Sequence, residues 1–340
     1  MSDWPKQVRI VEVGPRDGLQ NESAFVPTTA KLKFIADLVA AGLTNIEVTS
    51  FVHPQGVPQL ADALEVIRGL PNTDKVVFSA LVPNEKGLAR AIESGIKRIA
   101  VFTAVSETFV RRNINKTIRE SLDAFKPIVS SALSHSISVR GYLSTSFVCP
   151  FEGNIAKERV RELTQELLAI GVDEVSISDT IGAASPADVR RTVSYVLESV
   201  PASRLALHFH DTYGTALANV FAGLQLGIST FDSSAGGLGG CPYAPGASGN
   251  VASEDLVYML DRMGIATGVN LDAVVTAADG LTQVLEKPLN SRQWQRLRGR
   301  GGDSGCGSRS SDSLSSRSSC ADRSHADGSK PTSGVIDPRD

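Results

Sequence analysis

Short apolar runs alternate with helical patterns eight times along this chain of 340 residues. The runs begin roughly every 30 residues, the length of a strand, a helix and their two connections. We expect strands over Val8–Val13, Asn45–Thr49, Val76–Ala80, Arg98–Thr103, Ser136–Leu143, Glu174–Ser178, Leu205–His210 and Thr230–Ser234. We expect helices over the amphipathic stretches Thr28–Ala41, Ala61–Gly69, Glu85–Ser94, Arg119–Ser134, Ala156–Ile170, Pro186–Ser199 and Thr215–Leu226. Eight such units predict an α/β fold of the TIM (β/α)8 barrel type.

Glycine marks the ends of four expected helices. These residues are Gly42, Gly95, Gly171 and Gly227, and an apolar run restarts directly after each of them. Glycine is favoured there because a helix commonly ends on a residue with positive φ. A doubly wound open sheet is the alternative topology, but no G-x-G-x-x-G pattern follows the first expected strand.

The composition of the chain changes near residue 290. Residues 300–340 contain twelve serines and only three large apolar residues, Leu314, Val335 and Ile336. Such a stretch buries too little apolar surface to offset the entropy lost on ordering. We therefore expect a catalytic barrel over residues 1–290 and a disordered Ser/Gly-rich tail over residues 291–340.

Charge, hydropathy and cysteine content argue against a nucleic-acid-binding, membrane-spanning or disulfide-rich protein. The net charge of −3 indicates no nucleic-acid surface, and no apolar run reaches the roughly 18 residues of a membrane span. The first residues carry no targeting pattern, and four cysteines in so long a chain do not form a disulfide framework. We expect a cytoplasmic enzyme that acts without nucleic acid or membrane, and we expect it to be a homodimer.

Two histidines alternate in the seventh expected strand. His208 and His210 share one face of that strand, roughly 6–7 Å apart, while Phe209 points to the other face. Two imidazoles at this spacing can bind one divalent ion if oxygen ligands join them. The alternative is that one histidine is a hydrogen-bonded core residue and the other lies at the surface.

Other polar residues follow the expected strands at the same barrel end. In TIM barrels the active site lies at the carboxyl ends of the strands. The first strand leads to Arg16-Asp17, the second carries Glu47, the sixth leads to Asp179-Thr180, and the last leads through a glycine-rich loop to Asn250. Asp17, His208, His210 and Asn250 would supply two nitrogen and two oxygen ligands. That set suits Mg²⁺ or Mn²⁺ better than a structural zinc ion. Glu47 and Asp179 are either supporting carboxylates or partners in a helix cap or ion pair.

The loop after the last strand holds a cysteine among many glycines. Residues 236–246 include five glycines, and Cys241 lies within the same segment. A mobile loop of this kind could bring a thiol to bound substrate. The alternative is a small, half-buried cysteine in a tight turn.

Several segments resemble the 3-hydroxy-3-methylglutaryl-CoA lyase family. They are V-E-V-G-P-R-D-G-L-Q-N-E (11–22), R-R-N-I-N (111–115), S-D-T-I-G (178–182), H-F-H-D-T-Y-G (208–214) and G-L-G-G-C-P-Y-A-P-G-A-S-G-N (237–250). The similarity runs in order from about residue 6 to residue 290. That family belongs to the DRE-TIM metallolyases, which include the isopropylmalate and homocitrate synthases. These synthases resemble the chain at R-D-G and H-x-H, and they are not expected to carry the cysteine loop.

The resemblance implies cleavage of (S)-3-hydroxy-3-methylglutaryl-CoA to acetyl-CoA and acetoacetate with Mg²⁺ or Mn²⁺. Such a reaction would serve leucine degradation, ketone-body formation or the catabolism of a longer branched acid, and the sequence does not distinguish these pathways. It implies Asp17, His208, His210 and Asn250 as metal ligands, Arg16 as a catalytic cation, Cys241 as a proton-transfer group, and Glu47 and Asp179 as supporting carboxylates. Either His208 or Asp17 would be the general base. We expect Gln20, Asn113, Tyr142 and Thr180 to contact the acyl-CoA substrate.

Three departures from the family pattern bear on the acyl group. His53-Pro54-Gln55-Gly56 stands where Ser-Pro-Lys-Trp is expected, Val148-Cys149-Pro150-Phe151 replaces Gly-Cys-Pro-Tyr, and Ser178 replaces a glycine. They leave open a lyase for a longer branched 3-hydroxy-acyl-CoA and do not change the expected type of reaction. Because the synthases share R-D-G and H-x-H, a Claisen-type acyltransferase is a second alternative. The third alternative is a protein that binds metal or acyl-CoA without turnover.

Overall fold

Eight parallel strands form a closed barrel in a computed structural model, which describes residues 4–240 and 249–301. The barrel strands are β1 (Arg9–Glu12), β2 (Asn45–Ser50), β3 (Val77–Leu81), β4 (Arg98–Ala104), β5 (Ser138–Ser144), β8 (Glu174–Asp179), β9 (Leu205–Phe209) and β10 (Thr230–Ser233). Around the barrel they follow the order β1-β10-β9-β8-β5-β4-β3-β2. The predicted TIM barrel is therefore confirmed, and the open sheet is excluded.

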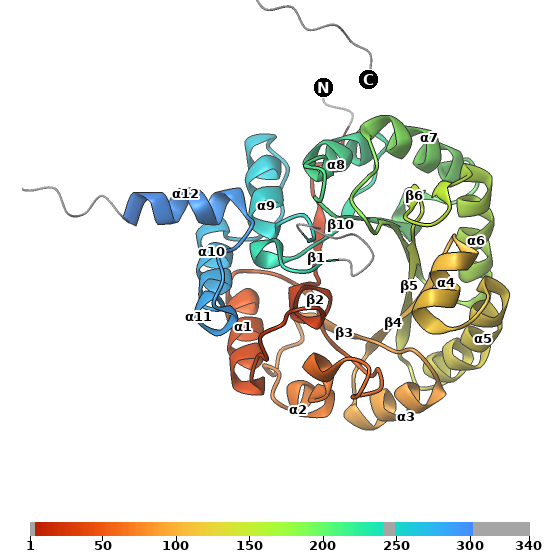
Figure 1. Cartoon of the computed structure of the whole chain (residues 1–340), viewed down its shortest axis with the longest axis horizontal. Helices are drawn as coiled ribbons and strands as arrows, with labels where there is room; N and C mark the ends of the chain where they lie inside the picture. Colours follow the sequence, from red (N-terminus) through yellow and green to blue (C-terminus); the bar gives the residue numbers. More distant parts are fainter. Residues whose placement is uncertain (1–3, 241–248, 302–340) are drawn as a thin grey trace, which may run out of the picture. The chain divides into compact units, whose positions relative to one another are not determined.

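Helices surround the barrel and cover the outer faces of its strands (Figure 1). They are α1 (Thr28–Ala40), α2 (Ala63–Arg68), α3 (Glu85–Ser94), α5 (Ile118–Ser134), α6 (Lys157–Ile170), α7 (Pro186–Leu197), α8 (Ala216–Gln225) and α9 (Ser253–Arg262). Helix α5 shows why they form: Leu122, Phe125 and Val129 lie on one stripe and are buried. The four glycines expected after helices all have positive φ, from 77° to 113°.

Several short elements add to the basic barrel. Helix α4 (Glu107–Ile114) follows β4, and β6 (Val148–Cys149) pairs with β7 (Gly153–Asn154) in a small antiparallel hairpin. Short turns are η1 (Gly14–Gly18), η2 (Pro58–Leu60), η3 (Ala202–Arg204) and η4 (Ala235–Gly237). Helix α4 was not expected, although serine is a favoured residue at the N-cap of a helix. The Ser106 hydroxyl caps α4 because it accepts from the Phe109 amide at 3.1 Å.

The folded unit extends beyond the boundary expected at residue 290. Helices α10 (Leu271–Asp279), α11 (Thr282–Leu285) and α12 (Arg292–Gly301) complete it, and it ends at Gly301. Trp294 is buried and its Nε1 donates to Asp279 at 2.7 Å, while Asp255 accepts from the Arg292 and Gln293 amides. These contacts hold α12 to the barrel. The rest of the expected disordered tail and the cysteine of the expected mobile loop lie outside the described residues.

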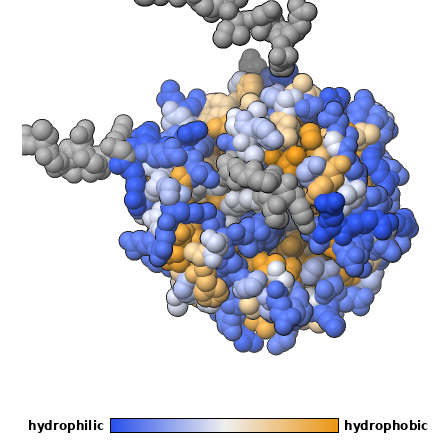
Figure 2. All heavy atoms as spheres, viewed as in Figure 1, coloured by the Kyte–Doolittle hydropathy of each residue, from blue (hydrophilic) through white to orange (hydrophobic). Residues whose placement is uncertain are grey.

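The face of the molecule over one barrel end is mainly hydrophilic at its rim. Figure 2 shows hydrophobic residues near the centre of the face over the barrel end, with a largely hydrophilic rim around them. No helix among the described residues is long and apolar enough to cross a membrane.

Candidate active site

The turn after β1 carries two of the expected site residues. Residues 14–18 form one π-helical turn, η1, which presents Arg16 and Asp17 at the carboxyl end of the barrel. The buried Glu12 carboxylate fixes this turn because it accepts from the Gly14 amide at 2.7 Å and the Ala235 amide at 2.9 Å. Burial raises the pKa of Glu12 to about 7, against the lowering effect of these hydrogen bonds. The turn is thereby anchored to the segment after β10.

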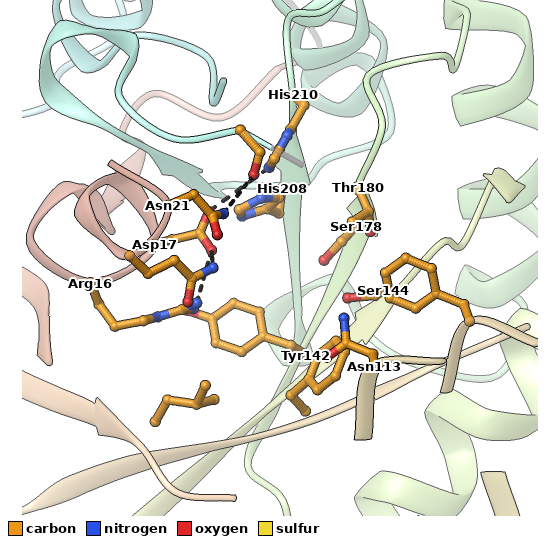
Figure 3. Close-up of a pocket in the computed structure, with 15 residues that line it drawn as sticks. Arg16, Asp17, Asn21, Asn113, Tyr142, Ser144, Ser178, Thr180, His208 and His210 are labelled. Carbon is orange, nitrogen blue, oxygen red and sulfur yellow. Dashed lines mark hydrogen bonds and ion pairs between the residues drawn. The ribbon is translucent and has the colours of Figure 1, made fainter. Parts of the chain in front are cut away.

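Asp17, His208 and His210 meet in one cluster. Their ligand atoms all lie within 4.8 Å of one another, and the two imidazole centroids are 5.2 Å apart. His210 Nε2 lies 3.8 Å from Asp17 Oδ2, and Asn250 Nδ2 donates to the same oxygen at 2.9 Å. Both histidines line the pocket, as the alternation along the strand predicts (Figure 3). The structure thus brings together the four residues predicted as ligands.

The chemistry of this cluster fits a divalent cation. His210 Nδ1 and Asn250 Oδ1 are buried and have no hydrogen-bond partner. Burial and the neighbouring His208 lower the pKa of His210 to about 4, so its ring is neutral near pH 7 and can act as a ligand. Burial alone would raise the pKa of Asp17, but Arg16 and the two histidines lower it below its usual value. An ionised carboxylate, the neutral ring of His210, the imidazole of His208 and an amide oxygen suit Mg²⁺ or Mn²⁺.

Backbone packing keeps Asn250 beside Asp17. Asn250 Nδ2 also donates to the Leu238 carbonyl at 3.0 Å. Gly239 has a φ of 116°, and a Cβ at this position would lie 2.6 Å from Asn250 Nδ2. Glycine is therefore required here for both its conformation and its lack of a side chain.

Arg16 is held rigidly at the edge of the same pocket. Its Nε donates to Glu47, and its Nη1 donates to Asp17 Oδ1 at 2.8 Å. The guanidinium carbon lies 5.4 Å from the centroid of the Tyr142 ring, and Tyr142 donates to Glu47 at 2.5 Å. Burial opposes the charge, but Glu47 and Asp17 raise the pKa of Arg16 above its usual value. The pocket therefore contains a permanent, oriented cation.

Polar and apolar side chains line the rest of the pocket. All four residues predicted to contact substrate are among the lining residues: Gln20, Asn113, Tyr142 and Thr180. Arg16 and Asp17 lie across the pocket from Ser144 and Asn113 (Figure 3). Leu81, Phe102 and Phe109 supply an apolar wall. The pocket can therefore receive a ligand that has both polar and hydrocarbon parts.

Three other sequence predictions have a different outcome. Glu47 and Asp179 are not among the pocket-lining residues. Asp179 accepts from the Ala183 and Ala184 amides at 3.1 and 3.0 Å, and burial raises its pKa to about 6. These amides precede α7, whose N-cap is Ser185, so Asp179 fixes the loop before the helix and does not cap it. Glu47 forms an ion pair with Arg16, which agrees with both the supporting role and the ion-pair alternative. Cys241 lies outside the described residues, and its predicted role is untested.

Sequence reasoning missed two residues behind the site. Asp232 Oδ2 lies 3.2 Å from His208 Nδ1, and Arg140 Nη2 donates to Asp232 Oδ1 at 2.6 Å. A signal was present, because each is a charged residue inside a strand that was expected to be buried. Such a charge requires a partner.

Comparison with known proteins gives a consistent result. Residues 7–280 match the family described as HMGL-like. The chain is 50% identical over 292 residues to hydroxymethylglutaryl-CoA lyase YngG of Bacillus subtilis, covering 86% of this chain and 98% of that protein. It is also 50% identical over 293 residues to a Pseudomonas aeruginosa protein named 3-hydroxy-3-isohexenylglutaryl-CoA/hydroxymethylglutaryl-CoA lyase, with coverage of 86% and 98%.

Solved structures agree with these sequence matches. The crystal structure of hydroxymethylglutaryl-CoA lyase from Pseudomonas aeruginosa superimposes with a TM-score of 0.86 at 48% identity, covering 88% of this chain and all of that one. An HMG-CoA lyase from Acinetobacter baumannii in complex with coenzyme A and 3-methylmalate gives a TM-score of 0.83 at 36% identity, covering 91% of this chain and all of that one.

Proposed function

Because the chain belongs to the HMGL-like family, and within it groups with the hydroxymethylglutaryl-CoA lyases, we propose that it cleaves (S)-3-hydroxy-3-methylglutaryl-CoA into acetyl-CoA and acetoacetate. One observation carries this proposal. Asp17, His208 and His210 form a cluster of potential metal ligands in the same pocket as the guanidinium of Arg16. Carbon–carbon cleavage next to a tertiary alcohol requires both a means to remove the hydroxyl proton and a cation for the enolate that leaves.

Asp17, His208, His210 and Asn250 would hold the cation, Mg²⁺ or Mn²⁺. When bound, the ion would acidify the substrate hydroxyl by polarising its oxygen. Asp17 contributes the negative charge of this ligand set, and the neutral His210 adds none. A net positive charge at the ion is therefore retained for the substrate.

Arg16 stabilises the negative charge that develops on the thioester oxygen. Its charge is permanent, and Glu47 and Asp17 fix its orientation before substrate arrives. A preorganised donor of this kind stabilises a transition state without reorganisation at the moment of reaction.

Two residues can take the hydroxyl proton, as the sequence also indicated. Asp17 has two carboxylate oxygens at the pocket, and His208 has a carboxylate partner, Asp232, that would stabilise its protonated ring. Once the bond breaks, the enolate carbon needs a proton, and Cys241 is the group that we expect to supply it.

The substrate would lie between the Arg16 side and the opposite wall of the pocket. Asn113, Ser144 and Thr180 supply neutral polar groups for the acyl carboxylate. Phe102 and Phe109 supply apolar surface for the hydrocarbon part. Coenzyme A in the complex of the Acinetobacter relative supports an acyl-CoA partner here as well.

A longer branched acyl-CoA is the second candidate substrate. The Pseudomonas relative named for an isohexenyl substrate is as similar to this chain as the Bacillus lyase is, at 50% identity. Of the three departures from the family pattern, Ser178 lines the pocket, and His53 and Val148 are not among its lining residues. A change in acyl preference would therefore arise at Ser178 before the other two.

Cleavage by wild type and by Arg16→Gln tests the proposal. We expect the variant to stay folded and to lose about 10³-fold in kcat, because it lacks the cation for the enolate. A variant with a near-normal rate would contradict this role of Arg16. Release of free CoA from acetyl-CoA and a 2-oxo acid by the wild type, without cleavage of the hydroxy-acyl thioester, would favour the acyltransferase instead.

We further propose a homodimer that works in the cytoplasm, in leucine degradation or ketone-body formation. The resemblance to the lyase family supports the pathway. The similar proteins carry both mitochondrial and cytoplasmic names, so the proposed location depends on the cysteine content.

A further inference from the structure

One arginine occupies the interior of the barrel below the pocket. Arg140 on β5 is 3% exposed, and each of its guanidinium nitrogens faces a different side chain. Nε donates to Glu174 Oε1 at 2.9 Å, Nη2 donates to Asp232 Oδ1 at 2.6 Å, and Nη1 donates to the Tyr142 hydroxyl at 3.2 Å. Two of these three partners lead to the candidate active site.

The first path runs to the metal cluster. Asp232 is fully buried on β10, where its Oδ2 accepts from Ser176 at 2.8 Å and faces His208 Nδ1 at 3.2 Å. A carboxylate on one ring nitrogen fixes which nitrogen carries the proton and how the ring is oriented. Asp232 thus directs His208 toward Asp17 and His210. Arg140 fixes Asp232 in turn.

The second path runs to the catalytic cation. Tyr142 donates to Glu47 Oε2 at 2.5 Å, and Glu47 accepts from Arg16 Nε. The Tyr142 ring lies between two guanidinium groups, with its centroid 5.1 Å from the Arg140 carbon and 5.4 Å from the Arg16 carbon. Figure 3 shows Tyr142 beside Arg16 in the pocket.

We propose that Arg140 is a positioning residue for both halves of the site, acting through Asp232 on His208 and through Tyr142 and Glu47 on Arg16. This inference rests on the proposed metal site. It requires a planar fork of donors, because a single ammonium cannot reach three separate acceptors in fixed directions. A role limited to charge balance would require only a cation at this position, which lysine also provides.

Arg140→Lys separates these two roles. We expect its affinity for Mn²⁺, measured by electron paramagnetic resonance without substrate, to fall about 10-fold or more. We also expect kcat at saturating Mn²⁺ to fall about 10-fold, because Arg16 is less well fixed. Unchanged Mn²⁺ affinity together with unchanged kcat would overturn the proposal.

Arg98→Lys is the matched control. Arg98 lies on the neighbouring strand β4 and binds Asp173 with two nitrogens at 2.7 and 2.9 Å. Its side chain donates to Asp173 and Ser138 and to none of the pocket-lining residues. The same substitution here should leave Mn²⁺ affinity and kcat within twofold of wild type. If Arg98→Lys lowered Mn²⁺ affinity and kcat as much as Arg140→Lys does, the contacts of Arg140 would not be the cause. That result would overturn the proposal.

Two single-path variants keep the proposal testable if Arg140→Lys fails to fold. Asp232→Asn should lower Mn²⁺ affinity about 10-fold or more. Tyr142→Phe should leave Mn²⁺ affinity within twofold of wild type and lower kcat at saturating Mn²⁺. The proposal is wrong if Asp232→Asn binds Mn²⁺ as wild type does. Weakened Mn²⁺ binding in proteins that do not cleave the thioester would support this inference while contradicting the proposed function.

Discussion

Two sets of buried polar groups, one at each end of the barrel interior, differ in whether they have partners. At the amino end, Glu174 accepts from both Arg9 and Arg140, so its charge is matched by two cations. At the carboxyl end, His210 Nδ1 and Asn250 Oδ1 are buried without a partner. Matched groups stabilise the folded chain, whereas unmatched groups reduce its stability and keep their capacity to bind a ligand. We infer that the paired groups at the amino end mainly stabilise the fold, whereas the unpaired groups at the carboxyl end serve to bind a ligand.

The largest effect on stability is expected at the amino end. Glu174→Ala removes the shared acceptor of two arginines and leaves Arg140 with a buried charge that is only partly compensated. Breaking a buried ion pair from one side costs about 3–5 kcal/mol. Urea unfolding should show a loss of this size. A loss below about 1 kcal/mol would contradict the stabilising role of this end.

A metal ion should stabilise the protein through the carboxyl end. At one hundred times its Kd, Mn²⁺ should raise the free energy of unfolding by about 2.7 kcal/mol, because it binds the folded state alone. The increment is measured as the difference between urea unfolding with Mn²⁺ and with EDTA. Glu174→Ala should retain the increment at one hundred times its own Kd, since all four proposed ligands are intact in that variant. Wild-type protein with no increment would contradict the metal site.

The smallest effect is expected for His210→Ala in metal-free protein. The substitution removes packed ring atoms, but it also removes a buried nitrogen without a partner, whose desolvation costs about 1–3 kcal/mol. These contributions oppose each other, so the free energy of unfolding should change by less than about 1 kcal/mol. The same variant should lose the stabilisation by Mn²⁺. A loss of more than 3 kcal/mol without metal would show that His210 is mainly a core residue.

Much of this comparison could be predicted from sequence. The repeated strand and helix patterns predicted the barrel, and the rule for its carboxyl end predicted that Asp17, His208 and His210 lie together. That rule works because parallel strands place all their carboxyl ends on one rim. The boundary at residue 290 was wrong because α12 contains few apolar residues, and it packs mainly through Trp294.

The polar interior of the barrel could not be predicted in the same way. Arg140 and Asp232 lie 92 residues apart, and their contact depends on the stagger of strands around the closed barrel. Local patterns do not determine that stagger. For Asp179 the reverse holds: its place at a strand end was predicted, but its hydrogen bonds depend on the path of the backbone at Ala183 and Ala184.

The most direct test of the central claim is product analysis with EDTA-treated protein and (S)-3-hydroxy-3-methylglutaryl-CoA. Our account predicts no cleavage without metal, and equimolar acetyl-CoA and acetoacetate once Mg²⁺ or Mn²⁺ is added back. Folded protein that binds Mn²⁺ but releases neither product would contradict the assignment of this pocket as a site for cleavage of that thioester.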